Sequence, residues 1–237
     1  MSNFTIETSD YIDWTFDYDI FFTFEVETSA VETVLPGRLR PFEARPGVSL
    51  VSCSVHHFSR NNLGKLPDFN EANVNVLVQP DLSIEMPHPK FAFYIVNVVS
   101  DCEPFLAHAN EVDKMPTYHS PSLRCVVSED GQSVSVKDDD GLLFECKSTY
   151  EGTPSFVNET IYGQGFSQIE GEDYNINFRW TGELIEHQRK GNAGQIYNHP
   201  SLGKLELPTE PMTCYLQMVG PRNQKNGQLR YYTPVKW

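Results

Sequence analysis

Residues 123–147 read LRCVVSEDGQSVSVKDDDGLLFECK and contain two turn signals in quick succession. The turns centre on Asp130-Gly131 and on Asp140-Gly141, and runs rich in valine, leucine and phenylalanine flank both of them. Asp-Gly steps favour the tight, positive-φ turns that join antiparallel strands, so they are strong local signals for β-hairpins. The sequence therefore predicts an antiparallel meander over this stretch.

The same strand pattern recurs along the rest of the chain. Short runs rich in Val, Ile, Phe, Tyr and Thr end at Gly, Pro, Asn or Asp, which is typical of strands. They lie at residues 20–26, 48–55, 74–78, 91–99, 174–178, 212–219 and 229–233. Helical signals are few, and we expect short helices at residues 30–35, 105–114 and 183–190. The fold class predicted is mainly β, a barrel or sandwich with a few short helices.

Composition limits the classes of function. The 237 residues are 39% hydrophobic, which suits one globular domain over residues 1–237. A net charge of -14 argues against nucleic acid and anionic membrane surfaces as partners. Neither a signal peptide nor a long apolar stretch is found, so we expect a soluble, cytoplasmic protein. The acidic residues 1–37, which contain no Lys or Arg, are interpreted as a solvated face.

The cysteines give no sign of a metal centre. The five cysteines are widely spaced and form no CxxC pair, so neither a zinc site nor a disulfide framework is indicated. We expect no metal and no cofactor.

Four segments, taken in order, resemble the acetoacetate decarboxylase superfamily. They are LPGRL at residues 35–39, PDFNEANVNV at 67–76, EVDKMPTY at 111–118, and WTG at 180–182 followed by His199-Pro200. The resemblance implies an antiparallel β-barrel-like core with a central cavity. In that family the cavity serves decarboxylation of β-keto acids through a Schiff base on a lysine.

The resemblance also shows a departure from the family pattern. The family carries two adjacent lysines directly after the proline, and the matching positions here hold Thr117 and Tyr118. Lys114, three positions before Thr117, is an alternative source of an amine. The family's N-terminal arginine has no counterpart, because no Arg precedes Arg38. The chain is therefore interpreted as a divergent member without the Schiff-base lysine.

Glu71 matches the active-site glutamate of the family. Strand alternation puts Glu71, Asn73 and Asn75 on one face and their apolar neighbours on the other. In a closed barrel this polar face would line a cavity, and in an ordinary sandwich it would face water. A cavity carboxylate could act as a general base, because burial would raise its pKa toward neutrality.

Several histidines and aromatic residues elsewhere in the sequence are further candidates for the same site as Glu71. His56 and His57 are adjacent, so they point to opposite faces of a strand and at most one of them lines a cavity. Tyr118 or His119 could supply a proton donor or acceptor, because both lie in the segment after Pro116 where the family keeps its catalytic lysines. Trp180 is interpreted either as core or as a substrate contact, and His199 as structural.

These residues lead to a functional hypothesis. We expect a small-molecule enzyme that acts on a carbonyl-containing, largely apolar substrate by acid-base chemistry, as a cyclase, isomerase or dehydratase in a biosynthetic pathway. The catalytic candidates are Glu71, Tyr118 and His119, and the substrate-binding candidates are His56, His57, Asn73, Thr117 and Trp180. A non-catalytic binding protein and a β-keto acid decarboxylase that uses Lys114 are the alternatives. Homo-oligomerisation is left open.

Overall fold

The computed structural model describes residues 11–61, 66–83, 91–128, 133–203, 205, 212–219 and 227–237. Its strands belong to one large sheet, with two short α-helices and one 3-10 turn between them. The elements are β1 (Tyr11–Glu27), α1 (Thr28–Glu32), β2 (Glu43–Arg45), β3 (Val48–Asn61), β4 (Phe69–Val78), β5 (Phe91–Ser100), α2 (Glu103–Glu111), β6 (Thr117–His119), β7 (Arg124–Val127), β8 (Ser133–Asp138), β9 (Gly141–Ile169), β10 (Glu172–Ile196), η1 (Pro200–Leu202), β11 (Met212–Val219), β12 (Gly227–Tyr232) and β13 (Val235–Lys236).

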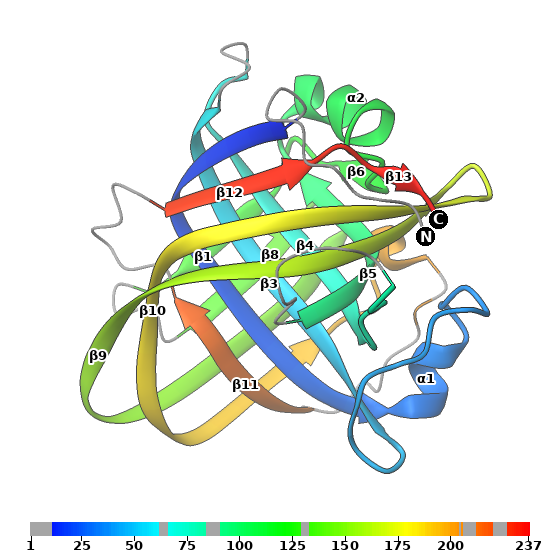
Figure 1. Cartoon of the computed structure of the whole chain (residues 1–237). Helices are drawn as coiled ribbons and strands as arrows, with labels where there is room; N and C mark the ends of the chain where they lie inside the picture. The colour runs from blue at the N-terminus through cyan, green and yellow to red at the C-terminus, as the bar shows by residue number, and fades with distance from the viewer. Residues whose placement is uncertain are drawn as a thin grey trace.

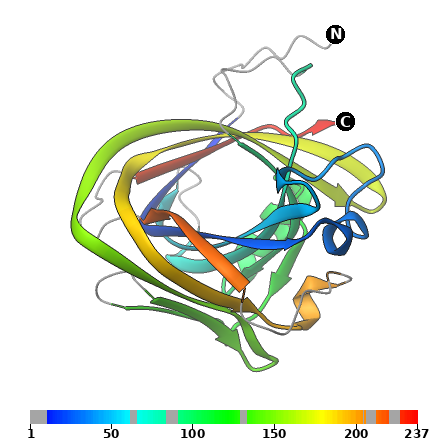
Figure 2. The ribbon, with the colours of Figure 1, turned by 90° about the horizontal axis from the view of Figure 1, so that it is seen from below.

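The sheet closes on itself into a barrel. Starting at β10, the hydrogen-bonded neighbours run β12, β1, β3, β4, β5 and β9, and β9 pairs with β10 again. Figure 2 shows these strands encircling a common axis. The predicted mainly β barrel is confirmed, with one difference. The pairings of β5 with β6 and with β9 are parallel, so the sheet is mixed rather than wholly antiparallel.

The meander predicted from residues 123–147 is present. β7 pairs antiparallel with β8, and β8 pairs antiparallel with β9. At the second turn Asp138 pairs with Gly141, whose φ of 132° is open to glycine but strained for other residues. The first Asp-Gly step falls in residues 129–132, which lie outside the described part of the chain.

Two hydrophobic cores lie on the two faces of the barrel wall. The inner core is inside the barrel and includes Trp14, Phe16, Phe58, Phe69 and Phe105. The outer core joins residues on the outer face of β1, β3 and β4 to residues of β8 and of the first part of β9. β9 and β10 are long enough to serve both layers, as their sweep around the molecule in Figure 1 shows.

A bulge in β1 decides which of its side chains enter the barrel. The pairing of β1 with β3 shifts between Phe16 and Tyr18, so Asp17 is an extra residue on the β1 side. Before the shift Phe16 faces inward with its partner Phe58, and after it Tyr18 pairs with His57. The shift inverts the alternation, as a one-residue insertion must. As a result, Asp19 faces the barrel interior.

The helices agree with the sequence prediction in part. α1 and α2 correspond to the predictions at 30–35 and 105–114, and α2 covers one end of the barrel (Figure 1). The helix predicted at 183–190 is wrong, because these residues continue β10 and pair with β9, for example Leu184 with Val157. A neighbouring strand satisfies the backbone there, and such tertiary pairing overrides a weak local helical preference. No helix among the described residues is long and apolar enough to cross a membrane.

Candidate active site

Polar residues form a row across four strands inside the barrel. Asp19 on β1 pairs with His56 on β3, His56 with Glu71 on β4, and Glu71 with Ser100 on β5. Directly paired residues of neighbouring strands share a face of the sheet. All four are at most 2% exposed, so the row is almost completely removed from water.

His56 is held on both sides of its ring. Asp19 Oδ1 lies 2.9 Å from His56 Nδ1, and Ser54 Oγ lies 2.9 Å from His56 Nε2. The second oxygen of Asp19 accepts a hydrogen bond of 2.6 Å from the indole N–H of Trp180. Because both members of the Asp19–His56 pair have further partners, the orientation of the imidazole is fixed by the surrounding strands.

Asn73 connects this pair to Glu71. Its amide Nδ2 donates to Glu71 Oε1 at 2.9 Å and lies 3.2 Å from His56 Nε2. The three side chains come from β3 and β4 and form one buried polar cluster. The prediction that Glu71, Asn73 and Asn75 share a face of their strand is therefore confirmed.

The cluster changes the proton affinity of its members. Burial raises the pKa of Glu71 to about 7, against the opposing effects of His56 and Asn73. Burial opposes protonation of His56, but the charges of Asp19 and Glu71 outweigh it and raise its pKa above 6.5. A buried carboxyl group with a pKa of about 7 beside an imidazole whose pKa is raised is suited to general acid–base chemistry.

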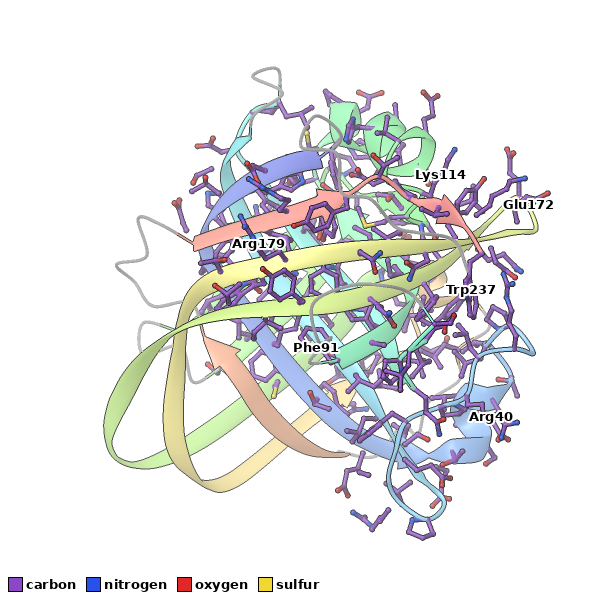
Figure 3. All side chains as sticks on the ribbon, in the orientation of Figure 1. Arg40, Phe91, Lys114, Glu172, Arg179 and Trp237 are labelled. Carbon is purple, nitrogen blue, oxygen red and sulfur yellow. The ribbon has the colours of Figure 1, made fainter. Side chains whose placement is uncertain are left out.

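A small cavity of about 30 Å³ lies beside the cluster. Its polar wall consists of Asp19, Ser54, His56, Asn73 and Asn75. Its apolar wall contains Phe21, Phe91, Phe93, Phe178, Trp180 and Tyr231, of which Phe91 is labelled in Figure 3. Glu71 is not part of the wall and contacts it through Asn73. The cavity is about the size of one water molecule.

Tyr231 on β12 adds a neutral hydroxyl to the apolar wall. Burial, together with the nearby carboxyl groups of Glu71, Asp113 and Asp19, raises its pKa well above 10. The phenol therefore keeps its proton at any physiological pH. It can donate a hydrogen bond to an oxygen that gains negative charge in the cavity.

A glycine on β9 makes room for the aromatic wall. Gly163 pairs with Phe178 across the β9–β10 ribbon. A methyl group on Gly163 would lie only 2.0 Å from Phe178 Cζ. The absence of a side chain at residue 163 is therefore required for the ring to lie flat against β9 and border the cavity.

A third buried carboxyl group enters from the end of the barrel covered by α2. Asp113 is 2% exposed, and its Oδ1 lies 3.5 Å from His108 Nε2 on α2. Burial raises the pKa of Asp113 against the opposing effect of His108. Its charge in turn contributes to the raised pKa values of Glu71 and Tyr231, which places it in the same electrostatic environment.

The predicted site residues divide between the two faces of the barrel wall. Glu71, His56, Asn73 and Trp180 meet inside the barrel. His57 points to the other face, where its ring stacks on Tyr18 at 5.7 Å, as expected for adjacent histidines.

The segment after Pro116 is divided in the same way. Tyr118 pairs with Val99 and turns to the outer layer, where its hydroxyl donates to Asp140 and its ring meets His199. Thr117 and His119 pair with Val98 and Ser100, so they face inward. None of the three is among the described residues of the cavity wall. The structure therefore does not bring Tyr118 together with Glu71.

Lys114 points away from the polar cluster. Its backbone is in the left-handed region, with a φ of 57°. Its ammonium group lies 5.5 Å from the ring centroid of Tyr174, and Figure 3 labels Lys114. The residues on either side, Asp113 and Met115, are both buried. This turn of the chain sends a carboxyl group, rather than an amine, toward the barrel interior.

Two residues of the site were missed by sequence reasoning. Asp19 was assigned to a solvated acidic face, and this is wrong because it is 0% exposed. The local sequence offered one indication of burial, because Asp19 directly precedes the apolar run at residues 20–22. Tyr231 carries no local signal, because it reaches the cavity through the pairing of β12 with β1 and β10.

Comparisons with known proteins give structural matches only. No protein-family model matches the sequence, and no curated protein matches it. Acetoacetate decarboxylase from Legionella pneumophila subsp. pneumophila str. Philadelphia 1 is similar in structure, with a TM-score of 0.62, 10% identity, and coverage of 96% of this chain and 88% of that chain. An acetoacetate decarboxylase-like enzyme from Sphingomonas wittichii RW1 matches with a TM-score of 0.56 and 11% identity, covering 100% of this chain and 99% of that chain.

A third match comes from a biosynthetic enzyme. The enduracididine biosynthesis enzyme MppR, solved with the condensation product of pyruvate and imidazole 4-carboxaldehyde, has a TM-score of 0.51 and 9% identity. The match covers 96% of this chain and 88% of that chain. The resemblance in sequence pattern and these structural matches agree: the chain has the acetoacetate decarboxylase-like fold, in a divergent version.

Proposed function

We propose that the chain is a small-molecule enzyme that removes a proton from the carbon next to a carbonyl group, without forming a Schiff base. The supporting observation is the buried cluster of Asp19, His56, Asn73 and Glu71 beside an aromatic cavity. Isomerisation, dehydration of a β-hydroxy ketone and aldol-type cyclisation all begin with this step. The proposal therefore covers the cyclase, isomerase and dehydratase classes together.

The roles in the cluster follow from proton affinity and spacing. Glu71, with a pKa of about 7, accepts the proton from carbon, and protonated His56 donates a hydrogen bond to the carbonyl oxygen as the enolate forms. Side chains paired across neighbouring strands are about 5 Å apart, so one can address the oxygen and the other the adjacent carbon. Tyr231 donates to the same oxygen, and Asp19 positions His56.

The apolar wall fits a substrate of low polarity. The aromatic rings of Phe91, Phe93 and Phe178 exclude water and strengthen the electrostatic interactions of the cluster. The cavity of about 30 Å³ is smaller than a carbonyl substrate, so binding requires these rings to move outward.

A Schiff-base decarboxylase has less support in this chain. Lys114 contacts Tyr174 rather than the cluster, and Thr117 occupies an inward-facing position where the family resemblance places a lysine. The fold match to enzymes, including a biosynthetic one, favours an enzyme over a non-catalytic binding protein. The buried polar cluster favours it as well, because burying these groups costs free energy of desolvation that a catalytic role would explain.

Proton exchange tests the proposal without knowledge of the product. Small ketones are incubated with the protein in D₂O, and loss of the α-proton signals is followed by ¹H NMR. We expect the native protein to accelerate exchange, and Glu71→Gln to lower the rate by about 100-fold or more. Tyr118→Phe, on the outer face, is the matched control and should leave the rate unchanged.

Three results would contradict the proposal. Full exchange activity in Glu71→Gln would contradict the assignment of the base. Ketone binding without exchange would identify a binding protein. A borohydride-trapped adduct on Lys114 would instead establish the Schiff-base route.

A further inference from the structure

The barrel interior concentrates acidic groups. Asp19, Glu71 and Asp113 are each at most 2% exposed and come from β1, β4 and the segment after α2. The bases that face them are the imidazoles of His56 and His108. Among the described residues, no Lys or Arg forms an ion pair with any of the three or lines the cavity. A carboxylate ligand would therefore meet repulsion at this place.

The cavity wall also contains two hydrogen-bond acceptors to which no group donates in the described structure. Asn73 and Asn75 are both more than 90% buried and both line the cavity. The amide oxygens of both have no hydrogen-bond partner within the described structure. The orientation of Asn73 is fixed, because its Nδ2 donates to the carboxyl group of Glu71. Two unpartnered buried acceptors cost free energy unless a ligand or a buried water molecule donates hydrogen bonds to them.

The opposite wall suits a positive charge. Phe91, Phe93, Phe178, Trp180 and Tyr231 border the cavity, and aromatic faces attract cations through their quadrupoles. The volume of about 30 Å³ accommodates one water molecule or one ammonium group. A cation would sit between the amide oxygens and the rings, with Glu71 directly behind Asn73.

From these observations we propose that the cavity is a subsite for a protonated amino group, so that the substrate is an amino ketone rather than a keto acid. The amino-group subsite stands on the cavity itself, and only the carbonyl part of the ligand rests on the proposed function. The ammonium group donates hydrogen bonds to Asn73 Oδ1 and Asn75 Oδ1, and the carboxyl group of Glu71 lies behind Asn73. Asp19 stays paired with His56.

A matched set of three probes tests the subsite on the native protein. Aminoacetone is cationic, hydroxyacetone is its neutral counterpart of nearly equal size, and acetoacetate is anionic. Dissociation constants are measured at pH 7 by NMR titration. We expect aminoacetone to bind at least tenfold more tightly than hydroxyacetone, and acetoacetate to bind most weakly. Equal binding, tighter binding of acetoacetate, or no binding of aminoacetone would overturn the inference.

A pair of leucine variants locates the effect. Asn75→Leu removes one acceptor from the cavity and should reduce the preference for aminoacetone over hydroxyacetone by about tenfold, or about 1.4 kcal/mol. Asn177→Leu is the matched control, because Asn177 is also buried with an unpartnered amide but does not line the cavity. Thermal melts of both variants confirm folding. An unchanged preference in folded Asn75→Leu would contradict the placement.

The same probes separate this inference from the proposed enzyme activity. Tight binding of aminoacetone without α-proton exchange would support the amino-group subsite and contradict the acid–base enzyme. Exchange of neutral ketones without preference for the amine would support the enzyme and contradict the subsite.

Discussion

Asp19 and His56 set the charge balance of the site. The charge of Asp19 is the main influence that raises the pKa of His56 against the effect of burial. Asp19→Asn keeps an oxygen for the indole N–H of Trp180 but removes that charge. We expect the pKa of His56 to fall by about one unit or more, since burial then dominates. An NMR titration of the imidazole resonances measures this change.

Asp17→Asn serves as the control for that titration. Asp17 lies 3.6 Å from His57 on the other face of the wall and is largely exposed. Its removal should leave the His56 titration unchanged. A His56 pKa that stays raised in Asp19→Asn would show that Glu71, and not Asp19, is the dominant partner.

The sequence located Glu71 more reliably than its partners. Polar residues at every second position of an otherwise apolar strand can be read directly, because strand side chains alternate with a period of two. His56 was recognised only as one of two alternatives. Which of His56 and His57 faces inward depends on the register between β1 and β3, which no local pattern specifies.

At the scale of elements, the contact of β9 with β10 shapes the cavity wall. Gly163→Ala would place a methyl group 2.0 Å from Phe178 Cζ, so the ring must move into the cavity. We expect the free energy of unfolding to fall by about 1–3 kcal/mol and ketone binding to weaken markedly. Urea unfolding and the NMR titration described above measure both effects.

Two further variants check the cause. Gly165→Ala meets its nearest atom at 3.3 Å and should cost less stability. The double variant Gly163→Ala/Phe178→Leu should recover part of the lost stability, because the shorter side chain leaves space for the methyl group. Equal losses in Gly163→Ala and Gly165→Ala would argue against the steric explanation.

The β1 bulge is the element-scale feature that sequence reasoning could not supply. Without it, the alternation set by Trp14 and Phe16 would point Tyr18 inward and Asp19 outward. A bulge forms where two strands pair with unequal residue counts, so it becomes visible only when both strands are in place.

For the whole molecule, the buried carboxyl group of Glu71 makes stability depend on pH. Its pKa rises from 4.5 to about 7 in the folded state, so the folded chain retains a proton that the unfolded chain releases. Stability therefore falls as pH rises from about 4.5 to 7 and levels off above that range. A shift of this size corresponds to roughly 3 kcal/mol.

Glu71→Gln should remove that dependence. The variant should gain stability relative to the native chain as pH rises from 5 to 8, as measured by urea unfolding at both values. Glu172→Gln, at an exposed ion pair with Lys236, is the control and should show no such trend. The raised pKa would be contradicted if Glu71→Gln changed the free energy of unfolding by the same amount at pH 5 and at pH 8.

By itself, the sequence determined the β class, the meander at residues 123–147 and the inward polar face of β4, because each follows from local alternation or turn chemistry. Only the tertiary structure decided the rest. Closure of the barrel through β9 and β10 brought Trp180 and Tyr231 to the cavity, and the bulge turned Asp19 inward beside His56. These outcomes depend on pairing between distant strands, whose register is a property of the assembled sheet rather than of any single segment.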